Sequence, residues 1–154
     1  MNGDLRTIQR KIAGAFIFSG DGKLLLGKSR KGGVYKDQWI VPGGGIEEHE
    51  TPEEAMAREI LEEVGIDVSS GHVEHLESGA TGLSEKVLRE TGERVMVQMT
   101  FYDYKVTLEQ KAEDIRLALD DDIAETRWFA ADELGKVPLS GPTEELLLKF
   151  GYIK

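Results

Sequence analysis

Apolar and polar positions alternate along the chain in blocks that predict a mixed α/β protein. Two apolar runs, residues 12–18 and 23–27, flank Ser19-Gly-Asp-Gly22, which has the composition of a hairpin turn. We therefore expect two antiparallel strands there. Further strands are predicted at 68–78, at 95–106 after a turn at Thr91-Gly92, and at 126–129.

Helix signals lie between these runs. Thr51-Pro-Glu-Glu54 combines an N-cap, a proline at the first helical position and a capping box, so a helix should run to about Val64 and stop at Gly65. A helical turn is expected at 131–135 and a terminal helix at 142–150, whereas 109–122 could be a loop or a short helix. This order of elements predicts helices packed on a mixed sheet.

Composition narrows the class of protein. The 154 residues predict one domain, 1–154, and the formal charge of −10 makes nonspecific attraction to nucleic acid or anionic lipid unfavourable. The chain has no cysteine, which excludes disulfides and thiol catalysis. The apolar run at 12–18 is too short to span a membrane. We expect a cytoplasmic protein.

Three acids on one helix face are the first sign of chemistry. Glu59, Glu62 and Glu63 share one side of the predicted helix, while Ile60 and Val64 fall on the other. Glu59 lies three residues before Glu62 and four before Glu63. Like charges at these helical spacings repel, and each such pair costs roughly 0.2–0.5 kcal/mol of helix stability. Such an array of carboxylates suits Mg²⁺, or alternatively Mn²⁺, and suits zinc poorly. The alternative is a solvated acidic face.

The surrounding residues fit the pattern G-x5-E-x7-R-E-U-x-E-E-x-G-U, where U is apolar. The matching positions are Gly44, Glu50, Arg58, Glu59, Ile60, Glu62, Glu63, Gly65 and Ile66. This resembles the Nudix box, the signature of the Nudix hydrolase family, and every specified position agrees. The preceding WIVPGGG at 39–45 and the later DIAETRWF at 122–129 also look like family elements.

The resemblance implies a Nudix-type α/β/α sandwich with a mixed, largely antiparallel sheet and a catalytic loop-helix-loop. It implies hydrolysis of a nucleoside diphosphate linked to another group X. The Gly43 carbonyl is expected to join Glu62 and Glu63 as a metal ligand. Glu59 could ligate the metal as well or accept a proton from the attacking water, and Glu50 would complete the acidic cluster.

Two further catalytic candidates flank this cluster. Arg58 lies four residues before Glu62, so an ion pair could orient that carboxylate; the alternative is a surface salt bridge. Enzymes resembling this one often draw another acid from the loop before the last tryptophan-bearing strand. Asp122, six residues before Trp128, matches best, and its alternative is an ordinary solvated loop residue.

Substrate contacts are harder to assign. Arg30 and Lys36 belong to a basic loop that could bind phosphates, although exposed solubilising charge would look the same. Trp39 could stack on a base or belong to the core. The aromatic residues of the strand at 95–106 could line a pocket or the core; they are Phe101, Tyr102 and Tyr104.

The compact chain looks most like the nucleoside triphosphate pyrophosphohydrolases of the family. The expected reaction converts an NTP or dNTP to the monophosphate and pyrophosphate; ADP-ribose or a nucleotide sugar is the alternative substrate. A module that binds a nucleotide without hydrolysing it is the other class, and the intact acids argue against it. The expected partner is a small nucleotide, and neither nucleic acid nor membrane; a homodimer stays open.

Overall fold

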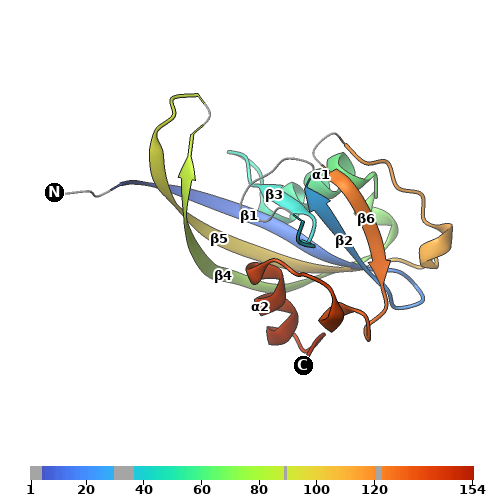
Figure 1. Ribbon diagram of the computed structural model, residues 1–154. Coiled ribbons are helices and arrows are strands. Elements are labelled where there is room, and N and C mark those ends of the chain that lie inside the picture. The colour runs from blue at the N-terminus through green and yellow to red at the C-terminus, as the bar shows by residue number, and fades with distance from the viewer. Residues whose placement is uncertain (1–4, 30–36, 89, 121–122) are drawn as a thin grey trace.

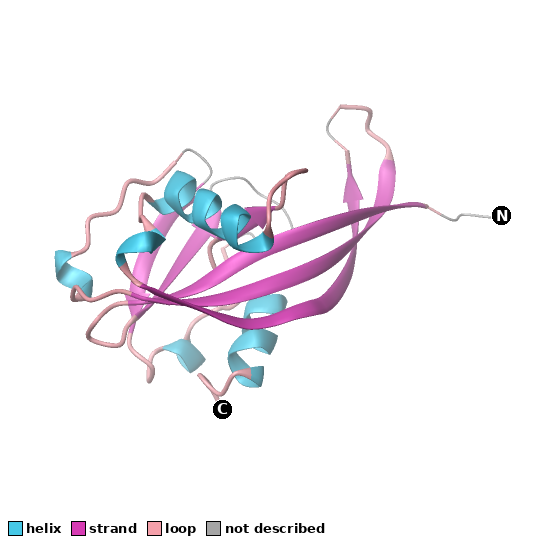
Figure 2. Ribbon diagram, turned by 180° about the vertical axis from the view of Figure 1, so that it is seen from behind, coloured by secondary structure: helices cyan, strands magenta, loops and turns pink. Residues whose placement is uncertain are grey.

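A mixed sheet with helices on both faces forms the body of the protein (Figure 1, Figure 2). The computed structural model describes residues 5–29, 37–88, 90–120 and 123–154. The strands are β1 (Arg6–Phe18), β2 (Leu24–Ser29), β3 (Gly43–Gly45), β4 (His72–Val87), β5 (Arg94–Thr107) and β6 (Ile123–Phe129). The helices are α1 (Pro52–Val64), α2 (Gly141–Lys149) and three short 3₁₀ turns, η1 (Val68–Ser70), η2 (Ala112–Asp114) and η3 (Leu134–Lys136).

The sheet runs in the order β4-β5-β1-β2-β6, and β3 pairs with β1 beside this path. β1 and β5 are parallel along their whole paired length, from Arg6 opposite Val95 to Phe18 opposite Thr107. Every other strand pair among the described residues is antiparallel. The predicted mixed, largely antiparallel sheet is therefore confirmed.

Alternation along β1 divides the interior into two layers. Ala13, Ala15 and Ile17 belong to the core cluster that holds the apolar face of α1, whereas Phe16 belongs to the cluster that includes Leu147 of α2. Successive side chains of a strand point to opposite faces, so one apolar strand serves both layers. Figure 2 shows α1 and α2 on opposite sides of the sheet. The predicted α/β/α sandwich is confirmed.

Three predicted strand boundaries were wrong, and one of them is the start of β6, which lies at Ile123 rather than at residue 126. β1 begins at Arg6 rather than at residue 12, and the strand predicted at 68–78 is the turn η1 followed by β4, which runs on to Val87. The added segments of β1 and β4 extend past the helices together with the start of β5 (Figure 1). Their strands are held by main-chain pairing, and many of their side chains are exposed, so they carry little hydrophobic signal.

The predicted helix start and stop around α1 are confirmed. Thr51 caps Glu54 N–H, the Glu54 side chain accepts from Thr51 N–H, and Gly65 adopts a left-handed conformation with φ of 77°. The terminal helix is present as α2, with Ser140 as its N-cap. Within the described residues, no helix combines the length and apolarity needed to cross a bilayer.

Candidate active site

The acidic face of α1 is held toward solvent by the apolar face behind it. Met56, Ile60 and Val64 are fully buried against the sheet. Glu62 therefore emerges on the outer side of the helix, where its side chain is 56% exposed, whereas the Glu59 side chain is 18% exposed. The local helix geometry thus brings the predicted acids to one side of α1.

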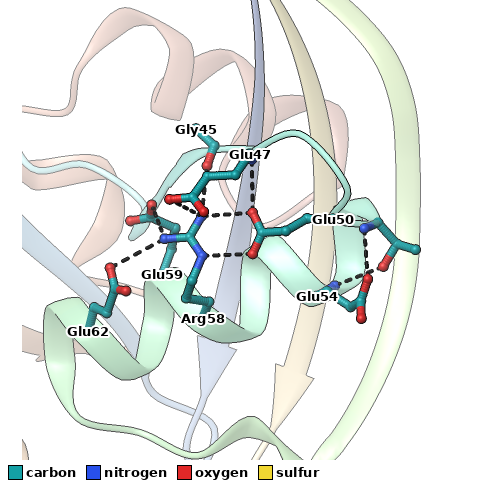
Figure 3. A network of polar contacts seen from close by, with 8 residues as sticks. Gly45, Glu47, Glu50, Glu54, Arg58, Glu59 and Glu62 are labelled. Atoms are coloured by element: carbon teal, nitrogen blue, oxygen red, sulfur yellow. Dashed lines mark hydrogen bonds and ion pairs between the residues drawn. The ribbon is translucent and has the colours of Figure 1, made fainter.

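Arg58 is the centre of the polar network on this face (Figure 3). Its Nε and Nη2 donate to the two carboxylate oxygens of Glu50 over 2.7 and 2.9 Å. Nη1 donates to Glu59 Oε1 over 3.0 Å and to Glu62 Oε2 over 3.3 Å. Nη2 also donates to the Gly45 carbonyl over 3.1 Å, so one guanidinium joins the β3 segment, the loop and the helix. The predicted ion pair with Glu62 is confirmed.

The Glu50–Arg58 pair is locked in its charged form. The guanidinium, with a further hydrogen bond from Glu47 N–H, lowers the pKa of Glu50 to about 2. Hydrogen bonding to Glu50 in turn raises the pKa of Arg58. A bidentate pair of this kind fixes orientation as well as charge. Glu50 therefore fixes the position of Arg58, which in turn contacts Glu59 and Glu62.

We expect Glu50 to stabilise the fold in a pH-dependent way. Glu50 ordinarily has a pKa of 4.5, and the folded protein lowers it to about 2, so its contribution is complete above pH 4.5 and is lost as pH falls toward 2. Urea unfolding should show wild type more stable than Glu50→Gln at pH 7, with a gap that narrows below pH 4.5. Glu47→Gln, which removes a more exposed carboxylate from the same loop, is the control. A gap independent of pH would contradict the assignment.

Glu59 lies against the glycine segment of β3. Burial raises the pKa of its carboxyl group, although the nearby Arg58 lowers it. A Cβ atom on Gly44 would overlap the Glu59 carboxylate, 2.8 Å from Oε1 and closer still to Cδ. The absence of a side chain at residue 44 is therefore what lets the carboxylate reach the strand.

Gly44→Ala is expected to displace the Glu59 carboxylate and to lower turnover roughly 10- to 100-fold, the usual cost of disturbing a group that orients a metal ligand. The fold should survive, because the overlapping atoms end a side chain that can rotate away. Steady-state kinetics on Gly44→Ala, Glu59→Gln and the double variant would check this. If the two effects multiply in the double variant, Gly44 does not act through Glu59.

The third acid of the helix meets the neighbouring glycine. Gly43 N–H donates to Glu63 Oε1 over 2.9 Å. Gly43 has φ of 158°, and a Cβ there would lie 2.5 Å from the Ala13 carbonyl oxygen, so only glycine fits between β1 and this strand. The close approach brings the main chain at residue 43 beside Glu63.

The donor set fits a hard divalent cation. The acids are carboxylates and the neighbouring main chain supplies carbonyl oxygens, which are the ligands that Mg²⁺ and Mn²⁺ prefer. In the described part of the chain, however, no three acids or histidines converge closely enough to form a ready-made metal cage. Glu59 and Glu62 accept from Arg58 instead, and Glu63 accepts from Gly43 N–H. Cation binding would require these carboxylates to turn toward one another.

A pocket opens on the opposite side of the glycine segment, between the sheet and α2. Its volume is about 250 Å³, and Gly43 and Gly44 form part of its wall. Most of the lining is apolar, but Asp103, Ser140 and Thr143 bring polar atoms to it. Asp103 is only 4% exposed, and Ser140 Oγ donates to Thr143 Oγ1 over 2.8 Å. One glycine segment therefore separates the pocket from the acids.

The aromatic residues of β5 divide between pocket and core. Phe101 lines the pocket, whereas Tyr104 is buried in the cluster under α1 and Tyr102 packs against that cluster. Both predicted alternatives are thus present in one strand. Asp103 and Thr143 were missed as site residues. A lone acid in an aromatic strand was the available signal for Asp103, while Thr143 carried only the signal of a helix start.

Trp39 belongs to the core and is not available for stacking on a base. Its side chain is 4% exposed and packs edge-on to Phe129, with ring centroids 4.9 Å apart. Lys28 Nζ lies 4.6 Å from the centre of the indole ring. Predicting Trp39 as a substrate contact was wrong, because the short segment before β3 turns inward. Three other predicted residues, Arg30, Lys36 and Asp122, lie outside the described residues.

Comparison with known proteins agrees with this architecture. The family model described as the NUDIX domain matches residues 8–150. The solved structure of the dihydroneopterin triphosphate pyrophosphohydrolase of E. coli superimposes with a TM-score of 0.66 and 19% identity, covering 91% of this chain and 93% of that one. At this level of identity the likeness shows the fold.

Curated relatives match most strongly over shorter stretches. An RNA pyrophosphohydrolase of Hydrogenovibrio crunogenus is 42% identical over 64 residues, which are 42% of this chain and 36% of the relative. Diphosphoinositol polyphosphate phosphohydrolase 2 of Rattus norvegicus is 54% identical over 46 residues, which are 30% of this chain and 24% of the relative. The chain thus spans about a third or less of either relative.

Proposed function

The chain belongs to the Nudix family, and we propose that it is a metal-dependent hydrolase of a nucleoside diphosphate linked to X. More specifically, the proposed reaction converts an NTP or dNTP to the monophosphate and pyrophosphate. The observation that carries the proposal is the glycine segment at 43–45. Its residues contact the acids of α1 through Gly43 and Gly44 and also line the pocket beside α2.

The size of the pocket supports a nucleotide with only its base enclosed. About 250 Å³ is below the roughly 300–1,000 Å³ typical of pockets for drug-sized ligands, so one ring system would fit while the rest of the substrate lies outside. Asp103 and Thr143 would offer hydrogen bonds to the base from an otherwise apolar lining. The phosphates would then pass the glycines toward α1.

The proposed division of labour follows from the contacts. Glu62 and Glu63, with the Gly43 carbonyl, would hold Mg²⁺ or Mn²⁺. Glu59 would join them or accept the proton of the attacking water, a role for which a pKa raised by burial is suited. A bound cation would offset phosphate charge and acidify that water. Glu50 and Arg58 would orient these carboxylates.

The relatives support the type of bond that is broken and leave the substrate open. One is named an RNA pyrophosphohydrolase and the other a diphosphoinositol polyphosphate phosphohydrolase. Both names denote hydrolysis of phosphate-rich compounds, which agrees with the acid-lined site proposed for this chain. Asp122, Arg30 and Lys36 stay predictions as a further acid and as phosphate contacts.

A substrate panel tests the proposal. Purified protein would be incubated with Mg²⁺ or Mn²⁺ and with the NTPs, the dNTPs, oxidised dNTPs, ADP-ribose and a nucleotide sugar. Phosphate and pyrophosphate would be assayed separately, with Glu62→Gln as the matched inactive control. Monophosphate plus pyrophosphate from a triphosphate is expected. If only ADP-ribose or the nucleotide sugar is cleaved, the substrate is not a triphosphate and belongs to that other class. If none of the compounds yields a product, the enzyme assignment is overturned.

A further inference from the structure

Arg10 differs from most of the described arginines, because among the residues that the structure describes only Arg10 and Arg116 make no ion pair, and Arg116 lines a different pocket beside Gly65. Arg6, Arg58, Arg94 and Arg127 each form an ion pair with a glutamate. Arg10 is exposed on β1, and among the residues that the structure describes no hydrogen bond or ion pair reaches its side chain. In a chain with a formal charge of −10, a guanidinium without an acid beside it leaves its donors available to a ligand.

The guanidinium of Arg10 lies at the glycine segment. A Cβ atom on Gly45 would be 3.2 Å from Arg10 Nη2, so the arginine folds over this residue. Gly45 also accepts from Arg58 through its carbonyl oxygen. The two guanidinium groups therefore meet the same glycine, and Arg58 brings the acidic cluster with it.

Strand alternation places Arg10 on the pocket side. Ile12 and Gly14 line the pocket, and Arg10 precedes Ile12 by two residues, so the three side-chain directions lie on one face of β1. The partner of Arg10 across the parallel ladder is Met99, which also lines the pocket. Arg10 is thus at the rim of the pocket, next to the glycines that separate it from α1.

From this geometry we propose that Arg10 is a substrate-binding residue that holds a phosphate group where the substrate leaves the pocket and passes Gly45. This rests on the proposed function, because it takes the base to lie in the pocket and the reacting phosphate at the acids. A planar guanidinium binds phosphate oxygens in pairs. It supplies positive charge that is not already paired, whereas the neighbouring Arg58 is bonded to Glu50, Glu59 and Glu62.

The proposal predicts a difference in binding rather than in chemistry. Arg10→Gln should raise KM for the preferred triphosphate roughly tenfold or more, as expected for loss of a charge-assisted hydrogen bond, and should change kcat much less. The KM of Arg10→Lys should lie between those of wild type and Arg10→Gln, because lysine keeps the charge and loses the paired donors. Thermal unfolding should stay close to wild type, since the side chain is exposed.

Arg6→Gln is the matched control. Arg6 is on the same strand and the same face, four residues or roughly 13 Å farther from the glycines, and it is already paired with Glu93 at 2.7 Å. Its KM should stay within about twofold of wild type. If KM rises equally for Arg6→Gln and Arg10→Gln, the effect comes from the loss of any positive charge on this strand. That result would overturn a specific role for Arg10.

Equilibrium binding separates this proposal from the proposed function. Calorimetry with inorganic tripolyphosphate, without turnover, should show weaker binding to Arg10→Gln than to wild type and to Arg6→Gln. If wild type hydrolyses triphosphates but Arg10→Gln has an unchanged KM, the Arg10 proposal fails and the enzyme assignment stands. If wild type hydrolyses nothing, the enzyme assignment fails, and equal tripolyphosphate affinity of wild type and Arg10→Gln would overturn the Arg10 proposal as well.

Discussion

Glu62→Gln is expected to lower kcat by at least about 100-fold while leaving the fold intact. The substitution keeps the size of the side chain and removes the charge with which it would bind a cation, and loss of one group that stabilises developing charge commonly costs about 10²–10³ in turnover. The fold should not suffer, because this side chain is 56% exposed. Turnover at saturating substrate and Mg²⁺, together with thermal unfolding, would measure both effects.

The matched control for this variant is Glu53→Gln. Glu53 is an exposed acid in the first turn of the same helix, and it is not among the acids that pair with Arg58 in the described part of the chain. It removes the same charge from α1 without touching the proposed site, so its turnover should stay near that of wild type. Unchanged turnover in a well-folded Glu62→Gln protein would remove Glu62 from the metal site.

Arg58→Ala is expected to lower both turnover and stability. The substitution removes every hydrogen bond that joins Glu50, Glu59 and Glu62 to one guanidinium. Loss of groups that orient metal ligands typically costs roughly 10- to 100-fold in activity or metal affinity. Kinetics across a range of Mg²⁺ concentrations should show a higher concentration for half-maximal activity, and urea unfolding should show a lower free energy of unfolding at pH 7.

Arg94→Ala distinguishes an organising role from an ordinary surface ion pair. Arg94 contacts Glu85 on the exposed hairpin of β4 and β5, and such pairs contribute about 0–1 kcal/mol. We expect that variant to leave the Mg²⁺ dependence unchanged. If Arg58→Ala behaves in the same way, Arg58 forms only a surface salt bridge and does not position the acids. Arg58→Lys, which keeps the charge without the paired donors, should be intermediate.

The helix that carries the acids was predictable from local rules. Thr51, Glu54 and Gly65 set its two ends through contacts within a few residues, and the spacing of the glutamates sets their common face. The resemblance to the Nudix box then identified the family before any long-range contact was known. Short-range hydrogen bonds depend on sequence spacing, which explains why these predictions were confirmed.

Strand ends and individual pocket residues were not predictable in the same way. The start of β1 is a strand because it pairs with β5, nearly 90 residues later, and its side chains are mostly polar and exposed. Trp39 was read as a possible base-stacking residue, although the tertiary structure packs it edge-on to Phe129. The type of a side chain alone does not determine whether it is packed in the core or exposed at a binding site.

The amino-acid order predicted the fold class and the ends of α1, and it placed on one face of that helix the acids that we propose to bind a cation. Only the tertiary structure decided that Gly43 and Gly44 stand between those acids and a pocket lined by residues of β1, β5 and α2. It also brought Arg10 to Gly45 across 35 residues of chain. The physical reason is that helix caps and faces arise from neighbouring residues, whereas pockets arise from the pairing and packing of distant ones.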